Sequence, residues 1–87
     1  MQIIYKYPLE EKLSTIVVKG KDPKVLFCGR DPRGQLSAWI EFTGHEEKDG
    51  IDSIVKIGII GTGTLFFKRK YINSIIDGAF VWHFYQF

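Results

Sequence analysis

Residues 25–42 read VLFCGRDPRGQLSAWIEF, two β-rich runs on either side of a turn sequence. The turn is Asp31-Pro32-Arg33-Gly34, with proline at its second position and glycine at its fourth, which is the preference of a type I turn. In the second run Ala38, Ile40 and Phe42 alternate with more polar positions, as in a strand with one buried face. The stretch therefore predicts a hairpin with strands at 25–30 and 35–42.

Similar short runs, rich in β-branched and aromatic residues, recur along the rest of the chain. They lie at residues 3–7, 14–18 and 53–60, and turn residues bound them at Pro8, Gly20–Pro23 and Lys48–Gly50. The charged segment 44–52 has no period and is expected to be an exposed loop. A chain of 87 residues has room for one core. We expect residues 1–87 to form a single all-β domain, a small antiparallel barrel or sandwich of six to seven strands.

Residues 65–77 fit two patterns, a helical stripe and the first strand of a second hairpin. The hairpin is preferred because Asp77-Gly78 is a strong two-residue turn sequence. With that turn, paired residue numbers sum to 155, so that Ile75 faces Phe80 and Tyr71 faces Phe84. Both faces of the hairpin then carry large apolar groups, which implies a covering layer, a ligand or a second chain. We expect a homo-oligomer whose interface includes Val81, His83 and Tyr85.

Composition excludes several classes of protein. A formal charge of +2 is too small for nucleic-acid binding by bulk electrostatics. Cys28 is the single cysteine, so the chain has no intrachain disulfide, and a buried thiol in a reducing cytosol is expected. The longest apolar runs are far below the length of about 18 residues that a spanning helix needs. We expect a cytoplasmic protein with no membrane partner.

The sequence contains no motif of an enzyme or a metal site. His45 and His83 have no metal-ligand spacing, and His83 is expected to be a core or interface imidazole. No nucleophile elbow or other catalytic motif occurs. We therefore expect no catalytic residues, no metal and no cofactor.

The glycine-rich run 58–64 is followed by Lys68-Arg69-Lys70. A bulge or bend at a strand end explains the glycines, and a solvated sheet edge explains the cations. The functional alternative is a cradle of backbone N–H groups for a phosphate. Trp39 stands on the polar face of its strand, where stacking on a base or a second buried layer would explain it equally well. The predicted ligand site, for an anionic nucleotide, consists of Trp39, Gly61, Thr62, Gly63, Thr64, Lys68, Arg69 and Tyr71.

Several motifs resemble a short, uncharacterised family encoded mainly by phages and prophages. They are Ile4–Leu9, Leu36–Trp39, the run Ile60-Gly61-Thr62-Gly63 and the ending from Tyr71-Ile72 through Gly78-Ala79-Phe80-Val81-Trp82-His83-Phe84. The resemblance covers nearly the whole chain, although Thr64 stands where many relatives have histidine. It implies a virus-encoded β-rich accessory protein that acts in the host cytoplasm.

Two counter-defence mechanisms suit such a chain. One is an oligomer that sequesters a nucleotide immune signal such as a cyclic dinucleotide. The other is an inhibitor that binds a host defence protein through Trp39 and the loop His45–Asp49. A small nucleic-acid-binding β-barrel is a third possibility.

Overall fold

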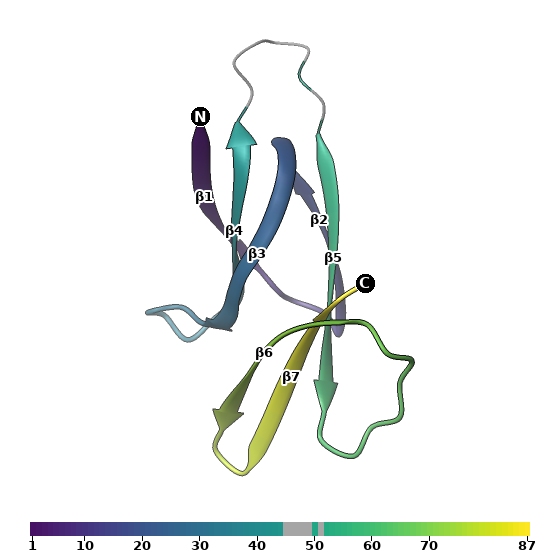
Figure 1. Ribbon diagram of the computed structural model, residues 1–87. Helices are drawn as coiled ribbons and strands as arrows, with labels where there is room; N and C mark the ends of the chain where they lie inside the picture. The colour runs from purple at the N-terminus through teal and green to yellow at the C-terminus, as the bar shows by residue number, and fades with distance from the viewer. Residues whose placement is uncertain (45–49, 51) are drawn as a thin grey trace.

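The computed structural model describes residues 1–44, 50 and 52–87, and these form two antiparallel sheets (Figure 1). The expected anchor His45–Asp49 lies outside the described residues. Within the described part no helix is long and apolar enough to cross a membrane. The strands confirm the predicted all-β fold. In one sheet they lie in the order β1 (Gln2–Pro8), β4 (Leu36–Gly44) and β3 (Gly20–Arg30), and in the other in the order β2 (Leu13–Val18), β5 (Ser53–Gly61), β7 (Phe80–Gln86) and β6 (Lys70–Asp77).

The core lies between the inner faces of the two sheets. On β4 the alternation is as predicted, because Ala38, Ile40 and Phe42 are buried. Opposite them the second sheet contributes its own inward positions, together with Phe84 of β7, which is also buried. The cluster is completed by Leu9, Ile16, Val18, Cys28, Val55 and Ile57. Burial of these apolar side chains is the main driving force that holds the layers together.

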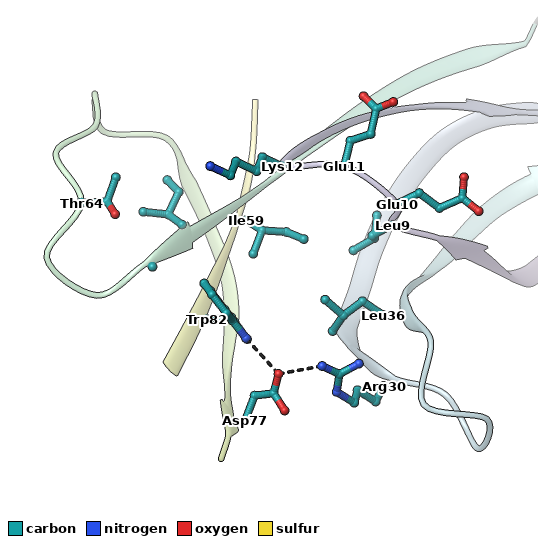
Figure 2. A pocket seen from close by; sticks show the side chains of 12 residues that line it. Leu9, Glu10, Glu11, Lys12, Arg30, Leu36, Ile59, Thr64, Asp77 and Trp82 are labelled. Atoms are coloured by element: carbon teal, nitrogen blue, oxygen red, sulfur yellow. Dashed lines mark hydrogen bonds and ion pairs between the residues drawn. The ribbon is translucent and has the colours of Figure 1, made fainter. Parts of the chain in front are cut away.

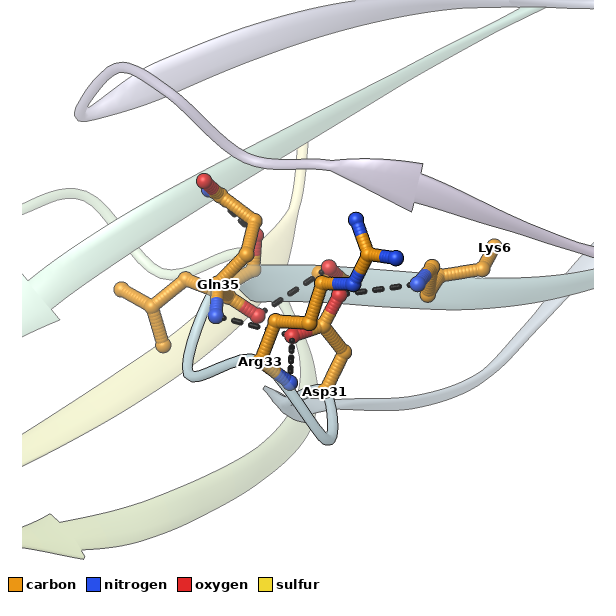
Figure 3. A network of polar contacts seen from close by, with 6 residues as sticks. Lys6, Asp31, Arg33 and Gln35 are labelled. Carbon is orange, nitrogen blue, oxygen red and sulfur yellow. Dashed lines mark hydrogen bonds and ion pairs between the residues drawn. The ribbon is translucent and has the colours of Figure 1, made fainter.

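The predicted β3–β4 hairpin is confirmed, and its turn is closed by the side chain of Asp31. The Gly34 N–H donates to the Asp31 carbonyl oxygen at 2.9 Å, the bond of a β-turn. The N–H groups of Arg33 and Gln35 donate to Oδ1 of Asp31, both at 2.9 Å, and Lys6 Nζ donates to Oδ2 at 2.8 Å (Figure 3). First the bond from Lys6 and then the backbone donors hold the pKa of Asp31 below its ordinary value. One carboxylate thus ties this turn to β1.

The turn expected at Gly20–Pro23 is wrong. Strand β3 already begins at Gly20, and the register with β4 shifts between Lys21 and Lys24, around Asp22 with φ 54°. Such a bulge accommodates Pro23, which has no N–H to donate to a ladder. Gly20 lies so close to the Thr43 carbonyl oxygen that a Cβ would clash with it. Its glycine therefore serves close strand pairing, while the chain reverses at Lys19.

Residues 70–77 form a strand, and the helical alternative for 65–77 is not adopted. The predicted pairing, however, is off by one residue at the turn. Asp77 faces Phe80, so paired numbers sum to 157, and the turn residues are Gly78 and Ala79. Gly78 has φ 62° and stands at the first central position, where a type II′ turn needs glycine; a turn centred on Asp77-Gly78 would need positive φ at Asp77 as well.

Further along the hairpin, a bulge between Tyr71 and Asn73 changes a second predicted pair. It brings Tyr71 opposite Tyr85 instead of Phe84, and the two rings meet edge-on at 5.4 Å. Between this bulge and the turn, each residue of β6 pairs with the residue two positions beyond its predicted partner on β7. Side chains alternate between the faces of a strand, so a shift of two leaves the faces unchanged, and Asn73 shares the inner face with Phe84 as predicted.

Side chains join the two sheets where β3 and β6 come together. The Asn73 amide accepts a hydrogen bond from the Cys28 N–H at 2.8 Å and donates one to the Cys28 carbonyl at 2.7 Å. At the end of the same strands, Arg30 donates to Asp77 at 2.6 Å. Strands β3 and β6 belong to different sheets, and the Asn73 amide makes the two hydrogen bonds that a neighbouring peptide group would make within a sheet. We call this contact between β3 and β6 the seam; it positions the β6–β7 hairpin beside β3.

Candidate functional site

A pocket of about 480 Å³ lies between the sheets beside the β6–β7 hairpin (Figure 2). Three groups of residues form it: the connection between β1 and β2, the adjoining ends of β3 and β4, and parts of the second sheet. Its volume is within the range of about 300–1,000 Å³ that is usual for small-molecule sites. The lining residues are Leu9, Glu10, Glu11, Lys12, Arg30, Leu36, Ile59, Ile60, Gly61, Thr64, Asp77 and Trp82.

The wall formed by the β1–β2 connection is fixed to both sheets by its backbone. The Leu9 N–H donates to the Leu36 carbonyl of β4, and the Ile59 N–H of β5 donates to the Lys12 carbonyl, each at 2.8 Å. Leu9 itself is buried, whereas Glu10, Glu11 and Lys12 are exposed. The pocket therefore has an apolar interior and a charged rim.

Asp77 organises the opposite wall. Its Oδ2 accepts hydrogen bonds from Arg30 at 2.6 Å and from the Trp82 indole N–H at 3.1 Å, as Figure 2 shows. The Arg30 bond, followed by the Trp82 bond, lowers the pKa of Asp77. Arg30 also donates to the Gly34 carbonyl at 2.6 Å, and Trp82 stacks on Phe80 with a centroid separation of 5.6 Å. The indole and the guanidinium are thus held in place before any ligand arrives.

The glycine-rich run contributes a tight turn beside this indole. The Thr64 N–H donates to the Gly61 carbonyl at 3.2 Å, and Gly63 has φ 89°, which suits the third position of a type II turn. A Cβ on Gly61 would come within 3.4 Å of the Trp82 ring. Of the predicted ligand residues, Gly61 and Thr64 therefore line the pocket, and the Thr64 N–H is already used to close the turn.

Thr62 and Tyr71, also predicted to bind the ligand, lie instead on the outer face of the second sheet. Thr62 Oγ1 is 2.9 Å from Nε2 of His83, Ser74 Oγ is 2.7 Å from its Nδ1, and the Tyr71 hydroxyl is 2.8 Å from Ser74 Oγ. The His83 ring thus connects the hydroxyls of Thr62 and Ser74, and Tyr71 joins this chain through Ser74. Neither Thr62 nor Tyr71 lines the pocket.

The other predicted ligand residues are further apart. Trp39 lies on the outer face of the first sheet, 5.9 Å from the Phe27 ring, and pairs across the strands with Lys6. Lys68 and Arg69 are exposed, and the Arg69 guanidinium lies 5.1 Å above the Phe87 ring. Within one copy of the chain, Gly61 and Thr64 are thus the only residues of the predicted ligand site that line the pocket.

The predicted interface residues share the outer face of the second sheet. Val81, His83 and Tyr85 of β7 face Ile76, Ser74 and Tyr71 of β6 in turn. Tyr85 is covered by Phe66 at 4.8 Å, and His83 is partly buried, so the hairpin's second apolar face is screened in part by the chain itself. Ile76 remains 82% exposed at the end of this face.

Sequence reasoning missed most of the pocket. Asp77 was expected in a turn, and no functional role was predicted for Trp82, Arg30 or Lys12. The Arg30–Asp77 contact joins residues 47 positions apart, so no local pattern announces it. The signal that could have indicated this contact is the pair of opposite charges, Arg30 and Asp77, each at the end of a predicted hairpin strand. Among the described residues no group of His, Cys, Asp and Glu is arranged to hold a metal ion.

The whole chain, residues 1–87, matches one family model, and the protein belongs to that family, a domain of unknown function (DUF7352). No curated protein and no solved structure matches the chain significantly.

Proposed function

We propose that this protein binds a nucleotide in the pocket between its sheets and withholds it without changing it chemically. The observation that carries the proposal is the meeting of a held indole, Trp82, with the Gly61–Thr64 turn and the cations Lys12 and Arg30 around one cavity of about 480 Å³. A base would stack on the indole and contact the apolar wall, since stacking of a base on an aromatic ring is tolerant of base identity. In a phage context, the ligand would be an immune signal of the host.

The charges of the pocket narrow the ligand class. Three carboxylates, Glu10, Glu11 and Asp77, stand against two cations, so the lining has a net charge of 2 − 3 = −1. Such a site disfavours a polyphosphate, whose several negative charges would be repelled. It repels a cyclic phosphodiester less strongly, because such a ligand has one charge per phosphate and no terminal phosphate. The rim carboxylates can in addition accept hydrogen bonds from the amino groups of a base.

Within this proposal the phosphate lies at the rim, near Lys12 and the Gly61–Thr64 turn. A desolvated phosphate needs charge-assisted hydrogen bonds, and the Lys12 ammonium supplies three donors. Backbone N–H groups of the turn would add to them. Arg30 contributes less, because Asp77 already neutralises it at 2.6 Å. Two copies of the chain, each with one phosphate site, could clasp a cyclic dinucleotide between them.

The test is calorimetry against a panel of cyclic mono- and dinucleotides. Trp82→Leu should weaken binding by about 1–3 kcal/mol, the usual contribution of one stacked base. Lys12→Ala, an exposed change, should weaken it while leaving the melting temperature unchanged. The matched control is Trp39→Leu, on the outer face of the other sheet, which should bind normally. Absence of heat and of any thermal shift with the whole panel would reject the proposal. Release of a hydrolysed product would show instead that the protein is an enzyme that cleaves the nucleotide.

A surface on the first sheet favours a second candidate, inhibition of a host protein. Its outer face presents Phe27 of β3, 46% exposed and opposite Trp39, and Ile4 of β1, 53% exposed and opposite Glu41. Aromatic side chains on a partly exposed face are common anchors of protein interfaces. A pull-down from host lysate that captures a partner with the wild type and not with Trp39→Ala would support inhibition. Capture by both chains would exclude this face.

A further inference from the structure

The segment between β5 and β6 exposes large apolar side chains directly beside a run of cations. Leu65 is 98% exposed and Phe67 84% exposed, and Lys68, Arg69 and Lys70 follow without interruption. We call residues 65–70 the apolar–basic loop. Water contact at two such side chains is unfavourable, and exposed apolar clusters rimmed by polar residues mark interaction sites.

Contacts on both sides hold the tip of this loop outward. The Phe66 ring turns back onto Tyr85 at 4.8 Å, and the Arg69 guanidinium lies over the Phe87 ring at 5.1 Å. On the N-terminal side, Thr62 is bonded to His83 at 2.9 Å. Leu65 and Phe67 are the sequence neighbours of Phe66. Because the Phe66 ring packs against Tyr85, the side chains on either side of it extend into solvent.

Along the sequence, the charge on and near the loop has one sign. Between Ser53 and Ile76 the sequence has no aspartate or glutamate, whereas it has Lys56 and the three cations of the loop. A partner of this surface is therefore anionic as well as apolar. We propose that the apolar–basic loop binds the surface of an anionic lipid bilayer, with Leu65 and Phe67 in the interfacial region and the cations among the lipid phosphates.

The side chains favour a bilayer over single-stranded nucleic acid. Leu65, the most exposed of them, has no aromatic face on which a base could stack, and Phe66 is already occupied by Tyr85. Long basic side chains beside an inserted apolar group extend to the headgroups, which is the pattern of proteins that lie on a membrane. Such binding needs no spanning segment, so it is compatible with the fold although the sequence led us to expect no membrane partner.

Co-sedimentation with vesicles tests the proposal. The protein should pellet with vesicles containing phosphatidylserine and stay in solution with phosphatidylcholine alone. The double variant Leu65→Ser/Phe67→Ser should lose at least about tenfold in partitioning, since two apolar side chains no longer leave water. Lys68→Ala/Lys70→Ala should lose about fivefold per cation, and added salt should reduce wild-type binding.

Matched controls separate the loop from general surface properties. Ile76→Ser removes an apolar side chain that is 82% exposed on β6, and Lys56→Ala removes an exposed cation of β5. Ile76→Ser should partition like the wild type, and Lys56→Ala should lose less than either lysine of the loop. Equal binding to both kinds of vesicle, or undiminished binding by the double serine variant, would overturn the proposal, as would no binding to either vesicle.

A fluorescent label locates the loop directly. Cys28 is fully buried, and burial raises the pKa of its thiol to about 12, so a thiol-reactive probe should leave it unmodified. An environment-sensitive fluorophore attached to Leu65→Cys should therefore report from the loop alone, and the unlabelled wild type checks the selectivity. Its emission should shift to the blue with anionic vesicles. A shift with a single-stranded oligonucleotide and none with vesicles would assign the loop to nucleic acid instead.

Discussion

Each of the two hairpins has an aspartate at its turn, and the two carboxylates are used differently. Asp31, at the β3–β4 turn, is 5% exposed and accepts two backbone hydrogen bonds from its own turn in addition to Lys6. Asp77, at the β6–β7 turn, is 34% exposed and accepts hydrogen bonds from the side chains of Arg30 and Trp82. The first aspartate satisfies the backbone around it, whereas the second holds two walls of a cavity.

The difference separates a structural turn from one that borders a site. A carboxylate whose acceptor positions are taken by backbone N–H groups has little capacity left for a ligand. Asp77 accepts its hydrogen bonds from the side chains of Arg30 and Trp82, and it lines the pocket. A charged group with a shifted pKa that lines a cavity is a better functional candidate than one that closes its own turn.

The largest expected effect concerns how the second hairpin is attached. Asn73→Ala removes both hydrogen bonds to the Cys28 backbone and leaves a partly buried N–H and C=O without partners. At about 1–3 kcal/mol for each of the two unsatisfied groups, we expect a loss of about 2–6 kcal/mol in unfolding free energy, measured by urea denaturation. Ser74→Ala, on the other face, should cost less than about 1.5 kcal/mol. An equal cost for both would mean that the seam does not depend on this amide.

How much of this contrast could be predicted depends on the range of the interactions. The Asp31 turn follows from four consecutive residues, because proline and glycine restrict the local backbone and the carboxylate bonds N–H groups two and four residues away. The Asp77 turn was misplaced by one residue, because Asp-Gly is typical of the two central positions of a type I′ turn, whereas Gly78 here takes the first central position and Ala79 the second. A stretch with turn composition, Gly20–Pro23, became a bulge because tertiary pairing overrode it.

The pocket was least predictable because its parts meet only through the sheet order. Trp82 alternates with Phe80 and Phe84 and has the pattern of a core residue, and nothing in the chain shows that its indole N–H bonds Asp77. The glycine-rich run was correctly interpreted as a bend at a strand end, and four of its residues, Ile59, Ile60, Gly61 and Thr64, line the cavity. The sequence could not show which of its hydroxyls point toward a ligand, since the Thr62 hydroxyl is hydrogen-bonded to His83, 21 residues away.

The second prediction tests the Asp31 turn by pH. The pKa of Asp31 is lowered in the folded protein, so its contribution to stability is complete above the ordinary value of 3.8 and is lost as pH falls through the lowered pKa. Asp31→Asn should lower the melting temperature at neutral pH and flatten its decline in acid. Thermal melts from neutral to acidic pH measure both effects, and Lys6→Ala is the partner control. A decline as steep as in the wild type would show that other carboxylates dominate acid unfolding.

The third prediction asks whether Asp77 acts on the ligand rather than on the fold. Asp77→Asn keeps an acceptor for the Trp82 N–H, frees Arg30 and raises the net charge of the pocket lining by one. We expect a smaller loss in melting temperature than for Asp31→Asn, because Asp77 is more exposed, and several-fold tighter binding of the cyclic nucleotide that binds the wild type. Calorimetry should show no change in affinity for Asp31→Asn. Equal affinities in all three proteins would place the ligand away from this wall.

The smallest expected effect compares the turn glycines. Gly34 has φ 86° and Gly78 φ 62°, and a Cβ built on either meets nothing within 4 Å, so backbone strain alone should decide the cost of a substitution. Alanine should cost about 1–2 kcal/mol at each site, the usual penalty of left-handed backbone for a residue with a Cβ, and asparagine less, since its side chain tolerates that conformation. Urea denaturation of the four variants measures this. If the two turns differ only in the partners of their aspartates, the costs at Gly34 and Gly78 should agree. A much larger cost at Gly34 would show that the Asp31 bonds also require the unstrained turn, because its carboxylate accepts two backbone hydrogen bonds there, whereas the Asp77 carboxylate accepts from the side chains of Arg30 and Trp82.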